Sequence, residues 1–318
     1  MNPSALIWMN GELVPWADAK VHVLTHALHY GTGVFEGVRC YDTEIGPAIF
    51  RGQAHTERLL QSAELFYMPV PYSAEELLEA QRQTVAANEL RECYIRPIVF
   101  RGYGQIGLNP LEAPVEVTIA VWEWGAYLGE EGKRSGVRAK VSSWRRISAD
   151  SLIPHAKASG QYLNSILAKV ETYKAGYEEA ILLDDKGHVC EGSGENIYVV
   201  REGEILTPPQ TAGILNGINR RSIIQIATDL GYEVIERDIA RAELYLAEEV
   251  FLTGTAAELV PVREVDDHAV GTGKPGEITR HLQQAFDDAL HGRTERYREW
   301  LDPVPMAAPT AARITGAA

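Results

Sequence analysis

The sequence predicts an α+β protein with two domains, and three observations support this prediction. The chain has 318 residues, which is about twice the length of a typical single domain. Apolar residues make up 45% and charged residues 23% of the chain, an ordinary composition for a folded globular protein that excludes disorder of the whole chain. Helical and extended patterns also mix without the regular strand–helix–strand repeat of a doubly wound sheet.

The first 122 residues are predicted to form a small N-terminal α/β domain. Asn10-Gly11 is a dipeptide typical of a tight hairpin turn between two short strands. Ser73 and Glu76 have the spacing of a capping box, which indicates the start of a helix. Strands are expected at 6–9, 12–15, 48–51, 94–100 and 115–122, with a further helix at 55–67 where apolar residues recur at helical spacing.

The glycine-rich, charged segment 123–136 is predicted to be an interdomain loop. A larger C-terminal domain that would bind the cofactor described below follows at 137–301. The tail 302–318 is rich in Pro and Ala and is expected to be disordered. Within the larger domain, strands are expected at 137–143, 180–183, 188–191, 196–200, 204–206, 233–237 and 249–252, and helices at 161–174 and 218–230.

Charge and cysteine content narrow the class of protein. The formal net charge is −14 and no basic run is longer than a pair such as Arg145-Arg146, so we expect no nucleic-acid partner. Three cysteines without a local spacing form neither a disulfide framework nor a zinc site. No signal peptide and no membrane span are visible. The cytoplasm is therefore the expected location.

Lys157 is the strongest single candidate for chemistry. It stands in a stretch of small residues between a predicted strand and a predicted helix, with no acidic neighbour in the sequence. A lysine in a loop that is buried can act as an amine nucleophile or bond covalently to a carbonyl compound. On local composition alone, an exposed loop lysine without a role is the more common case.

Three further segments have features of anion or ring binding. Segment 191–196 is a glycine-rich loop after a strand, and Glu191 could hydrogen-bond a heterocycle nitrogen there. Segment 215–220 opens a helix, whose free N–H groups and dipole favour an anion. Segment 253–258 is a small-residue turn that suits a phosphate or carboxylate. Each of these segments alone is equally typical of an ordinary turn or helix start. Arg58, in the predicted helix 55–67, is likewise equally typical of a solvated charge on a helix.

Tyr94 and Arg96 share one face of a predicted strand, because side chains alternate along a strand, and together they could bind a carboxylate. Aromatic residues elsewhere belong more often to a core than to a ligand cage. The spacing of His22, His26 and His29 suggests a metal, but no acidic partner accompanies them. Local hydrogen bonding is the better interpretation, and we expect no metal.

In their order along the chain, these motifs resemble the fold-type IV aminotransferases that use pyridoxal phosphate, and most closely the branched-chain amino acid aminotransferases. The resemblance implies the two-domain fold of D-amino acid aminotransferase and extends from about residue 7 to residue 302. So many motifs in a fixed order outweigh the ordinary interpretation of each one. The motifs that carry the resemblance are segments 29–37, 55–59, 94–97, 124–127, 157–162, 191–196, 217–220 and 254–258.

This resemblance implies pyridoxal 5′-phosphate as the cofactor. Lys157 would be the catalytic residue, bonded to the cofactor and moving the substrate's α-proton. Glu191 would face the pyridine nitrogen and Tyr162 the phenolic oxygen. The contacts to the phosphate, and the remaining contacts to the cofactor, would be made by Arg58, Gly194, Asn196, Leu215, Gly217, Ile218, Asn219 and Thr255. The family commonly has Thr in place of Asn219, so a hydroxyl contact to phosphate would be lost or replaced.

The resemblance also implies the substrates, which are L-leucine, L-isoleucine and L-valine with 2-oxoglutarate, in a ping-pong reaction. Tyr94 and the turn at Thr255, Ala256 and Ala257 would bind the α-carboxylate, and Arg96 the γ-carboxylate. Tyr30 and the loop 104–109 would reach in from a second subunit, which implies a homodimer. Gly37 and the apolar wall of Phe35, Trp124, Tyr127 and Tyr162 would complete the substrate pocket.

Two kinds of alternative remain open at this stage. The same scaffold serves D-amino acid aminotransferases, (R)-amine transaminases and aminodeoxychorismate lyases, but Tyr94, Arg96 and segment 124–127 favour branched-chain substrates. A non-catalytic binding protein could keep the fold. The presence of Lys157, Glu191, Arg58 and Tyr162 argues against that alternative.

Overall fold

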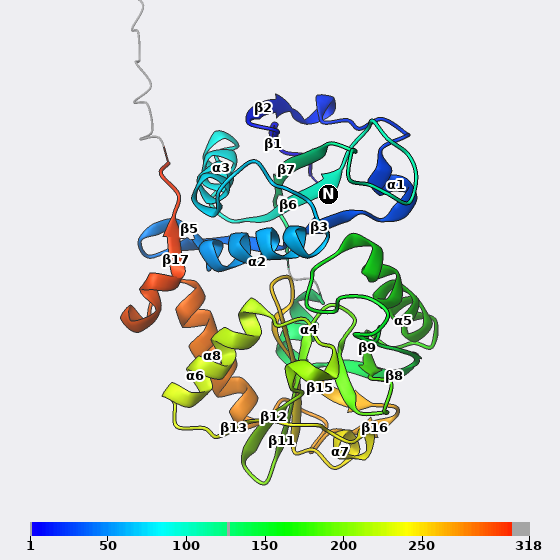
Figure 1. Ribbon diagram of the computed structural model, residues 1–318. Coiled ribbons are helices and arrows are strands. Elements are labelled where there is room, and N and C mark those ends of the chain that lie inside the picture. The colour runs from blue at the N-terminus through cyan, green and yellow to red at the C-terminus, as the bar shows by residue number, and fades with distance from the viewer. Residues whose placement is uncertain (1, 126–127, 307–318) are drawn as a thin grey trace, which may run out of the picture.

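Two β-sheets, stacked one above the other and each covered by helices, make up the protein (Figure 1). The computed structural model describes residues 2–125 and 128–306. The mixture of helix and sheet confirms the α+β class. Within the described residues, none of the helices combines the length and the apolar character needed to cross a membrane.

The first sheet is antiparallel throughout, in the strand order β17-β5-β4-β6-β7-β1-β2, with β3 paired to β6. Its strands are β1 (Leu6–Met9), β2 (Glu12–Pro15), β3 (Gly33–Phe35), β4 (Val38–Thr43), β5 (Gly46–Phe50), β6 (Cys93–Arg101), β7 (Val115–Trp122) and β17 (Leu301–Pro303). The helices α1 (His26–Tyr30), α2 (Gly52–Leu65) and α3 (Ala74–Ala87) accompany it. A short 3-10 helix spans Trp16–Asp18.

The second sheet is mixed, in the order β10-β9-β8-β15-β14-β11-β12-β13, with β16 paired to β15. Its strands are β8 (Val137–Arg145), β9 (Glu179–Leu183), β10 (Val189–Gly192), β11 (Asn196–Arg201), β12 (Glu204–Thr207), β13 (Val234–Glu236), β14 (Glu249–Gly254), β15 (Glu258–Val265) and β16 (His268–Ala269). Its helices are α4 (Gly129–Ser135), α5 (Tyr162–Lys174), α6 (Ile218–Asp229), α7 (Arg241–Tyr245) and α8 (Glu277–Leu290), with 3-10 turns at Ser159–Gln161, Gln210–Ala212 and Glu295–Trp300.

Elements with a strong local signal form where the sequence predicts them. Asn10 and Gly11 both have positive φ, 50° and 102°, as a two-residue hairpin turn of this type requires. Ser73 accepts a hydrogen bond from the Glu76 backbone, and Glu76 accepts one from the Ser73 backbone. The capping-box prediction is therefore confirmed.

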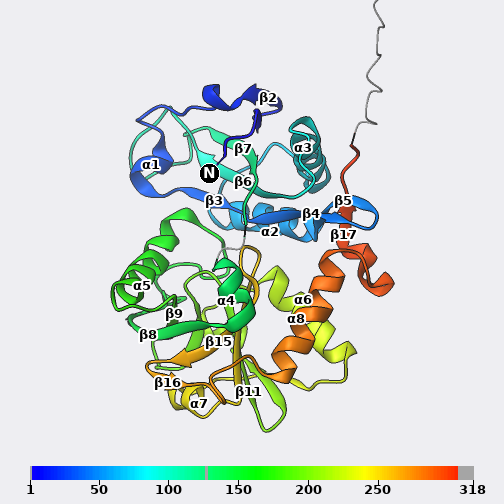
Figure 2. The same cartoon turned by 180° about the vertical axis from the view of Figure 1, so that it is seen from behind.

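The chain differs from the prediction in several places, among them strands β4 and β15, which the sequence does not predict. Segment 123–136 contains the helix α4 and is not loop throughout. Helix α8 is not predicted from the sequence, and Figure 2 shows it lying beside α6. The disordered tail is predicted from residue 302 onward, but Asp302 and Pro303 lie in β17, which pairs with β5 through Leu301↔Phe50. Residues 307–318 of that predicted tail lie outside the described part of the chain.

A shared core joins the two sheets. Tyr41 and Phe50 of the first sheet pack in one buried cluster with Tyr198 and Phe251 of the second and with Phe286 of α8. Close to this junction, Val34 of β3 forms an isolated bridge with Ala158. The loop that carries Lys157 is thus fixed against the first sheet although it follows β8 of the second sheet.

Candidate active site

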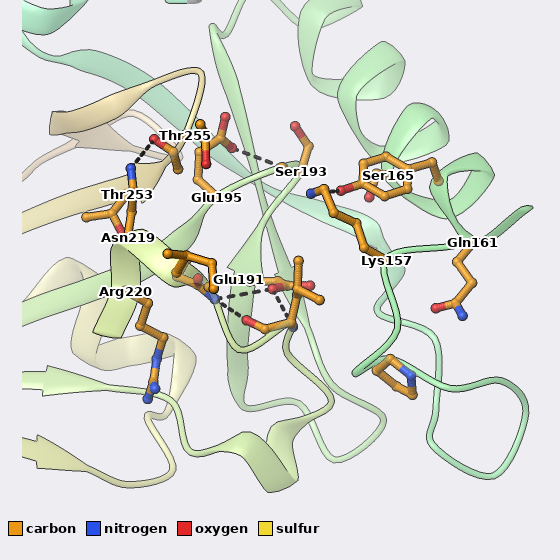
Figure 3. A pocket seen from close by; sticks show the side chains of 18 of the residues that line it. Lys157, Gln161, Ser165, Glu191, Ser193, Glu195, Asn219, Arg220, Thr253 and Thr255 are labelled. Carbon is orange, nitrogen blue, oxygen red and sulfur yellow. Dashed lines mark hydrogen bonds between the residues drawn. The ribbon is translucent and has the colours of Figure 1, made fainter. Parts of the chain in front are cut away.

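A pocket lies at the junction between the two sheets, lined by Arg58 of α2 beside the first sheet and otherwise by residues between 146 and 255. Phe35 donates a backbone hydrogen bond to the carbonyl of Lys157 at 3.0 Å, and the Lys157 backbone donates to the Ser62 hydroxyl at 3.2 Å. These contacts fix the loop so that the Lys157 side chain enters the pocket. Figure 3 shows Lys157 and Glu191 pointing into this space from opposite sides.

Lys157 has the surroundings of a reactive amine. Its Nζ donates a hydrogen bond to Tyr162 Oη at 2.8 Å and lies 5.2 Å from the centre of the Phe35 ring. The sequence shows no acidic neighbour, but in space Glu191 faces the same amine across the pocket. The amine therefore lies between a phenol, an aromatic face and a carboxylate.

Glu191 is buried and held from three directions. Its carboxylate lies 2.7 Å from Arg146 Nε and accepts hydrogen bonds from the Leu215 backbone at 3.1 Å and from Asn196 Nδ2 at 3.4 Å. Burial raises the pKa of Glu191, and Arg146 opposes that rise. Arg146 is not among the predicted site residues, although the sequence shows it in a basic pair with Arg145.

The start of α6 offers free backbone donors. No side chain caps this helix at Gly217, so the first N–H groups, including those of Ile218 and Asn219, lack a capping partner inside the helix. Asn219 donates through Nδ2 to the Gly254 carbonyl at 3.0 Å, while its buried Oδ1 has no partner among the described residues. The helix dipole and these N–H groups together favour an anion.

Arg58 completes this anion site, and two residues that the sequence prediction missed hold it in place. Buried Glu36 accepts hydrogen bonds from Arg58 Nε at 2.6 Å and Nη2 at 2.9 Å, and His55 Nδ1 lies 2.8 Å from the same carboxylate. Burial alone would raise the pKa of Glu36, but Arg58 and His55 lower it well below its usual range. Glu36 lies inside motif 29–37 and His55 inside motif 55–59. These two motifs are the sequence signal that could identify both residues.

Arg96 lies among aromatic rings on the substrate side. Its guanidinium carbon is 4.8 Å from the Phe35 ring centre, 5.3 Å from that of Tyr94 and 5.9 Å from that of Trp122. The Tyr94 and Trp124 rings meet edge to face at 4.6 Å. Phe35 and Trp124 of the predicted aromatic wall thus lie close to Arg96 and Tyr94, and Trp122 joins them although the sequence does not predict it.

Gly37 and the turn after β14 complete the side of the site where Arg96 lies. A Cβ at Gly37 would lie 1.9 Å from Tyr94 Oη, so glycine is needed for the tyrosine to reach its position. Thr255 lines the pocket together with Gly194, and Ala256 and Ala257 follow it in the turn. The turn therefore lies beside the start of α6, as two anion-binding segments of one site would.

Tyr30 and the loop 104–109, predicted to reach in from a second subunit, do not line this pocket within the described residues of the chain. Tyr30 is 43% exposed and its ring lies tilted against that of His26, with ring centres 4.6 Å apart. Leu108, in the loop 104–109, is 90% exposed. Tyr127 lies outside the described residues. The predicted contributions of Tyr30 and this loop therefore depend on a second subunit.

Comparison with known proteins identifies the class. The family model described as amino-transferase class IV matches residues 33–265, which is more than half of the chain. The protein belongs to the class IV aminotransferase family, and the predicted fold and family are confirmed.

Curated and solved relatives are similar over nearly the whole chain. A branched-chain-amino-acid aminotransferase of Pseudomonas aeruginosa is 50% identical over 295 residues, 93% of this chain and 96% of its own. The crystal structure of the Escherichia coli branched-chain amino acid aminotransferase has a TM-score of 0.93 at 48% identity, covering 95% of this chain and 100% of its own. The Thermobaculum terrenum enzyme of the same name, in its PLP-containing holo form, has a TM-score of 0.90 at 37% identity and covers 96% and 100%.

Class IV aminotransferases depend on pyridoxal 5′-phosphate, and the residues of this pocket fit that cofactor. The unpartnered Asn219 Oδ1 and the uncapped start of α6 lie at the same end of the pocket as Arg58 and Thr255. Glu191 and Lys157 lie elsewhere on its wall. An anion site, a buried carboxylate and an amine are the three groups that a phosphorylated pyridine aldehyde requires.

Proposed function

We propose that this protein transfers the α-amino group of L-leucine, L-isoleucine and L-valine to 2-oxoglutarate, giving branched 2-oxo acids and L-glutamate. One observation carries the proposal: the Lys157 amine and the Arg96 guanidinium lie over the same Phe35 ring, at 5.2 Å and 4.8 Å. A reactive amine therefore adjoins a pocket that is aromatic on its walls and cationic in one place. Relatives of about half identity carry the corresponding name.

Each residue of the pocket has a distinct role in this reaction. When bound, pyridoxal phosphate withdraws electrons from the substrate Cα and carries the amino group between the two half-reactions. Lys157 Nζ would take the proton from the substrate Cα as general base and, as general acid, would deliver it to the cofactor's C4′ carbon. Glu191, oriented by Arg146, holds a proton at the ring nitrogen. The phosphate is held by Arg58, Thr255 and the backbone at Ile218 and Asn219.

The pocket must accept both an aliphatic side chain and a γ-carboxylate. Within residues 2–125 and 128–306, no carboxylate forms an ion pair with Arg96, which rests on Phe35, Tyr94 and Trp122 instead. Aromatic faces stabilise a cation without neutralising it. Arg96 therefore stays available for the γ-carboxylate of glutamate, while leucine occupies the aromatic space without displacing a salt bridge.

A substrate panel with the purified holoenzyme tests this function. We expect turnover of L-leucine, L-isoleucine and L-valine with 2-oxoglutarate, and little turnover of D-amino acids or (R)-amines. Preferential turnover of a D-amino acid or an (R)-amine would contradict the proposed substrate class.

The role of Lys157 is tested separately by Lys157→Ala. Removal of the amine should abolish turnover of every substrate, because this amine is the group that moves the α-proton. The control is Lys186→Ala, which changes an exposed lysine in the turn between β9 and β10 and should leave the rate unchanged. Normal activity of Lys157→Ala would refute the assignment.

The homodimer also belongs to this proposal. Helix α5 buries its small side chains, such as Ser165 and Ala168, and leaves larger apolar ones in solvent. Leu163 is 66% and Ile166 53% exposed, and Leu167 and Val170 lie on the same side. Contiguous exposed apolar residues of this kind usually mark a surface covered by another protein. A second copy of the chain would cover them and bring Tyr30 to its partner's pocket.

The cytoplasmic location is supported by the thiols. Cys40, Cys93 and Cys190 are all free and buried. Unpaired cysteines are typical of proteins in reducing compartments.

A further inference from the structure

Glu258 ends the turn between β14 and β15 with an unusual backbone. Its φ is 60°, a left-handed conformation that is unfavourable for a residue with a Cβ. Gly254 pairs with Glu258 across the hairpin, so residues 255–257 form a three-residue loop. The residue that closes such a loop in the left-handed region is most often glycine. A glutamate persists there when its surroundings hold it.

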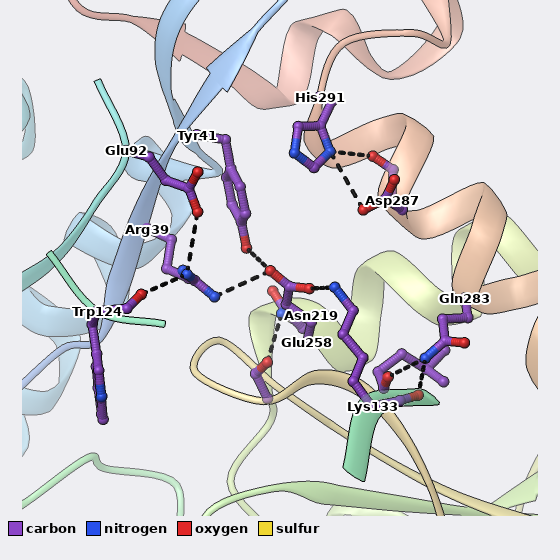
Figure 4. A network of polar contacts seen from close by, with 12 residues as sticks. Arg39, Tyr41, Glu92, Trp124, Lys133, Asn219, Glu258, Gln283, Asp287 and His291 are labelled. Atoms are coloured by element: carbon purple, nitrogen blue, oxygen red, sulfur yellow. Dashed lines mark hydrogen bonds and ion pairs between the residues drawn. The ribbon is translucent and has the colours of Figure 1, made fainter. Parts of the chain in front are cut away.

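The Glu258 carboxylate is held by three donors from outside its own sheet (Figure 4). Arg39 Nη1 and Tyr41 Oη, both on β4 of the first sheet, donate to Oε1 at 3.1 Å each. Lys133 of α4 forms an ion pair with Oε2. The Glu258 side chain is only 10% exposed. A buried carboxylate with this many charged partners has little freedom to move.

The other end of the same turn is also fixed. Asn219 Nδ2 donates to the carbonyl of Gly254, the residue that precedes the turn, at 3.0 Å. The three turn residues, Thr255, Ala256 and Ala257, are therefore clamped between α6 on one side and Glu258 on the other.

Arg39 extends this network to the aromatic wall. Its Nη2 donates to the Trp124 carbonyl at 2.9 Å, while Nη1 holds Glu258. Arg39 is 5% exposed, so both bonds are shielded from water. One guanidinium thus links the turn after β14 to the segment that places the Trp124 ring against Tyr94.

We propose that Glu258 is a positioning residue for substrate recognition. Its carboxylate fixes the turn 255–257 in the orientation that lets this turn hold the α-carboxylate of the substrate, and through Arg39 it ties the turn to Trp124. Glu258 itself does not touch the substrate. This inference rests on the proposed function, because the α-carboxylate is the group that every substrate of the reaction shares.

Three variants of the holoenzyme test the inference. Glu258→Ala should raise KM about tenfold for both L-leucine and 2-oxoglutarate, with a smaller fall in kcat, because binding of the common carboxylate is lost. Glu258→Gly removes the backbone strain as well as the side chain and should raise KM to a similar extent. Glu258→Gln keeps the shape and two of the three donors, and should restore most of the affinity. A Glu258→Gly variant with wild-type KM would overturn the proposal, since the side chain would then have no role.

A second measurement avoids turnover. 4-Methylpentanoate, an aliphatic monocarboxylate, is titrated into each holoenzyme and followed by the cofactor absorbance. Its Kd should rise about tenfold in Glu258→Ala. If Glu258→Ala does not fold, Tyr41→Phe removes one donor to Glu258 and should raise the same Kd by a smaller factor. An unchanged Kd in every folded variant would refute the inference.

The control separates positioning from stability. Glu249 lies at the other end of β14, where it accepts hydrogen bonds from the Thr279 backbone at 2.7 Å and the Thr279 hydroxyl at 2.5 Å. Glu249→Gln should lower Tm without changing KM. If the wild-type enzyme fails to turn over leucine, the proposed function is wrong. If it turns over leucine and Glu258→Ala leaves KM and Kd within about twofold of wild type, only the positioning role is wrong.

Discussion

At the scale of single residues, Arg96 separates the two kinds of substrate. Arg96→Ala should reduce kcat/KM for L-glutamate and 2-oxoglutarate by about 100-fold, corresponding to about 3 kcal/mol for a lost charged hydrogen bond. The loss for L-leucine should be much smaller, because an aliphatic side chain makes no ion pair. Steady-state kinetics on both substrates measure the ratio.

The matched control for this change is Arg91→Ala. Arg91 is an exposed arginine just before β6 that pairs with Asp42 on the surface, and its removal should affect neither substrate. Equal losses for leucine and glutamate in Arg96→Ala would argue against a γ-carboxylate role.

The buried carboxyl group of Glu195 should make the folding stability of the protein depend on pH. Burial, together with the neighbouring Glu179, raises the pKa of Glu195 to about 8, while Lys169 opposes this rise. The folded state therefore keeps a proton that the unfolded state loses near its ordinary pKa of 4.5. Stability should fall as the pH rises from about 4.5 to about 8, and level off above.

Glu195→Gln removes this titration. The difference in Tm, variant minus wild type, should grow more positive between about pH 5 and about pH 8, measured by thermal unfolding at about five pH values. Parallel curves for the two proteins would show that Glu195 does not carry a proton in the folded state.

At the scale of elements, the start of α6 depends on one glycine. A Cβ at Gly217 would lie 2.1 Å from Asn196 Oδ1, so Gly217→Ala should displace either the helix start or Asn196. Because both adjoin the anion site, the Kd for pyridoxal 5′-phosphate should rise at least about tenfold. Equilibrium titration of the apoprotein with the cofactor measures it.

Another helix start provides the comparison. Ser73→Ala removes the cap of α3, far from the pocket, and should cost about 1 kcal/mol of folding stability while leaving cofactor affinity unchanged. Equal cofactor affinity in both variants would mean that the start of α6 takes no part in binding.

Local chemistry explains which elements could be predicted. The turn at Asn10-Gly11, the cap at Ser73 and the start of α6 each carry their signal within a few residues, so the sequence shows them directly. The contacts that orient the site join residues far apart in the chain, such as Glu36 with Arg58 or Arg39 with Glu258. Nothing in the sequence around either partner specifies the other. The residues predicted to bind the cofactor therefore line one pocket, whereas Arg146 and the residues that hold the site in place are not predicted.

At the scale of the whole molecule, the exposed apolar side of α5 predicts association. Ile166→Asp places a charge among Leu163, Leu167 and Val170, and should convert the proposed dimer to a monomer with reduced activity, because the partner's Tyr30 would be lost from the pocket. Sedimentation at micromolar concentration gives the mass.

A comparable change outside that surface serves as the reference. Leu230, an isolated apolar residue that follows α6, is also exposed, and Leu230→Asp should not change the mass. A wild-type protein that sediments as a monomer would disprove the dimer.

The pairing of β17 with β5 has a consequence for the order in which the protein folds as it is synthesised. Strand β5 is complete once residue 50 has left the ribosome, but its partner lies at 301–303. The edge of the first sheet therefore stays open while residues 51–300 are translated, and an open strand edge can pair with other chains. The protein can close that edge only after residue 303 has been synthesised, so shorter nascent chains carry an edge at which aggregation can start.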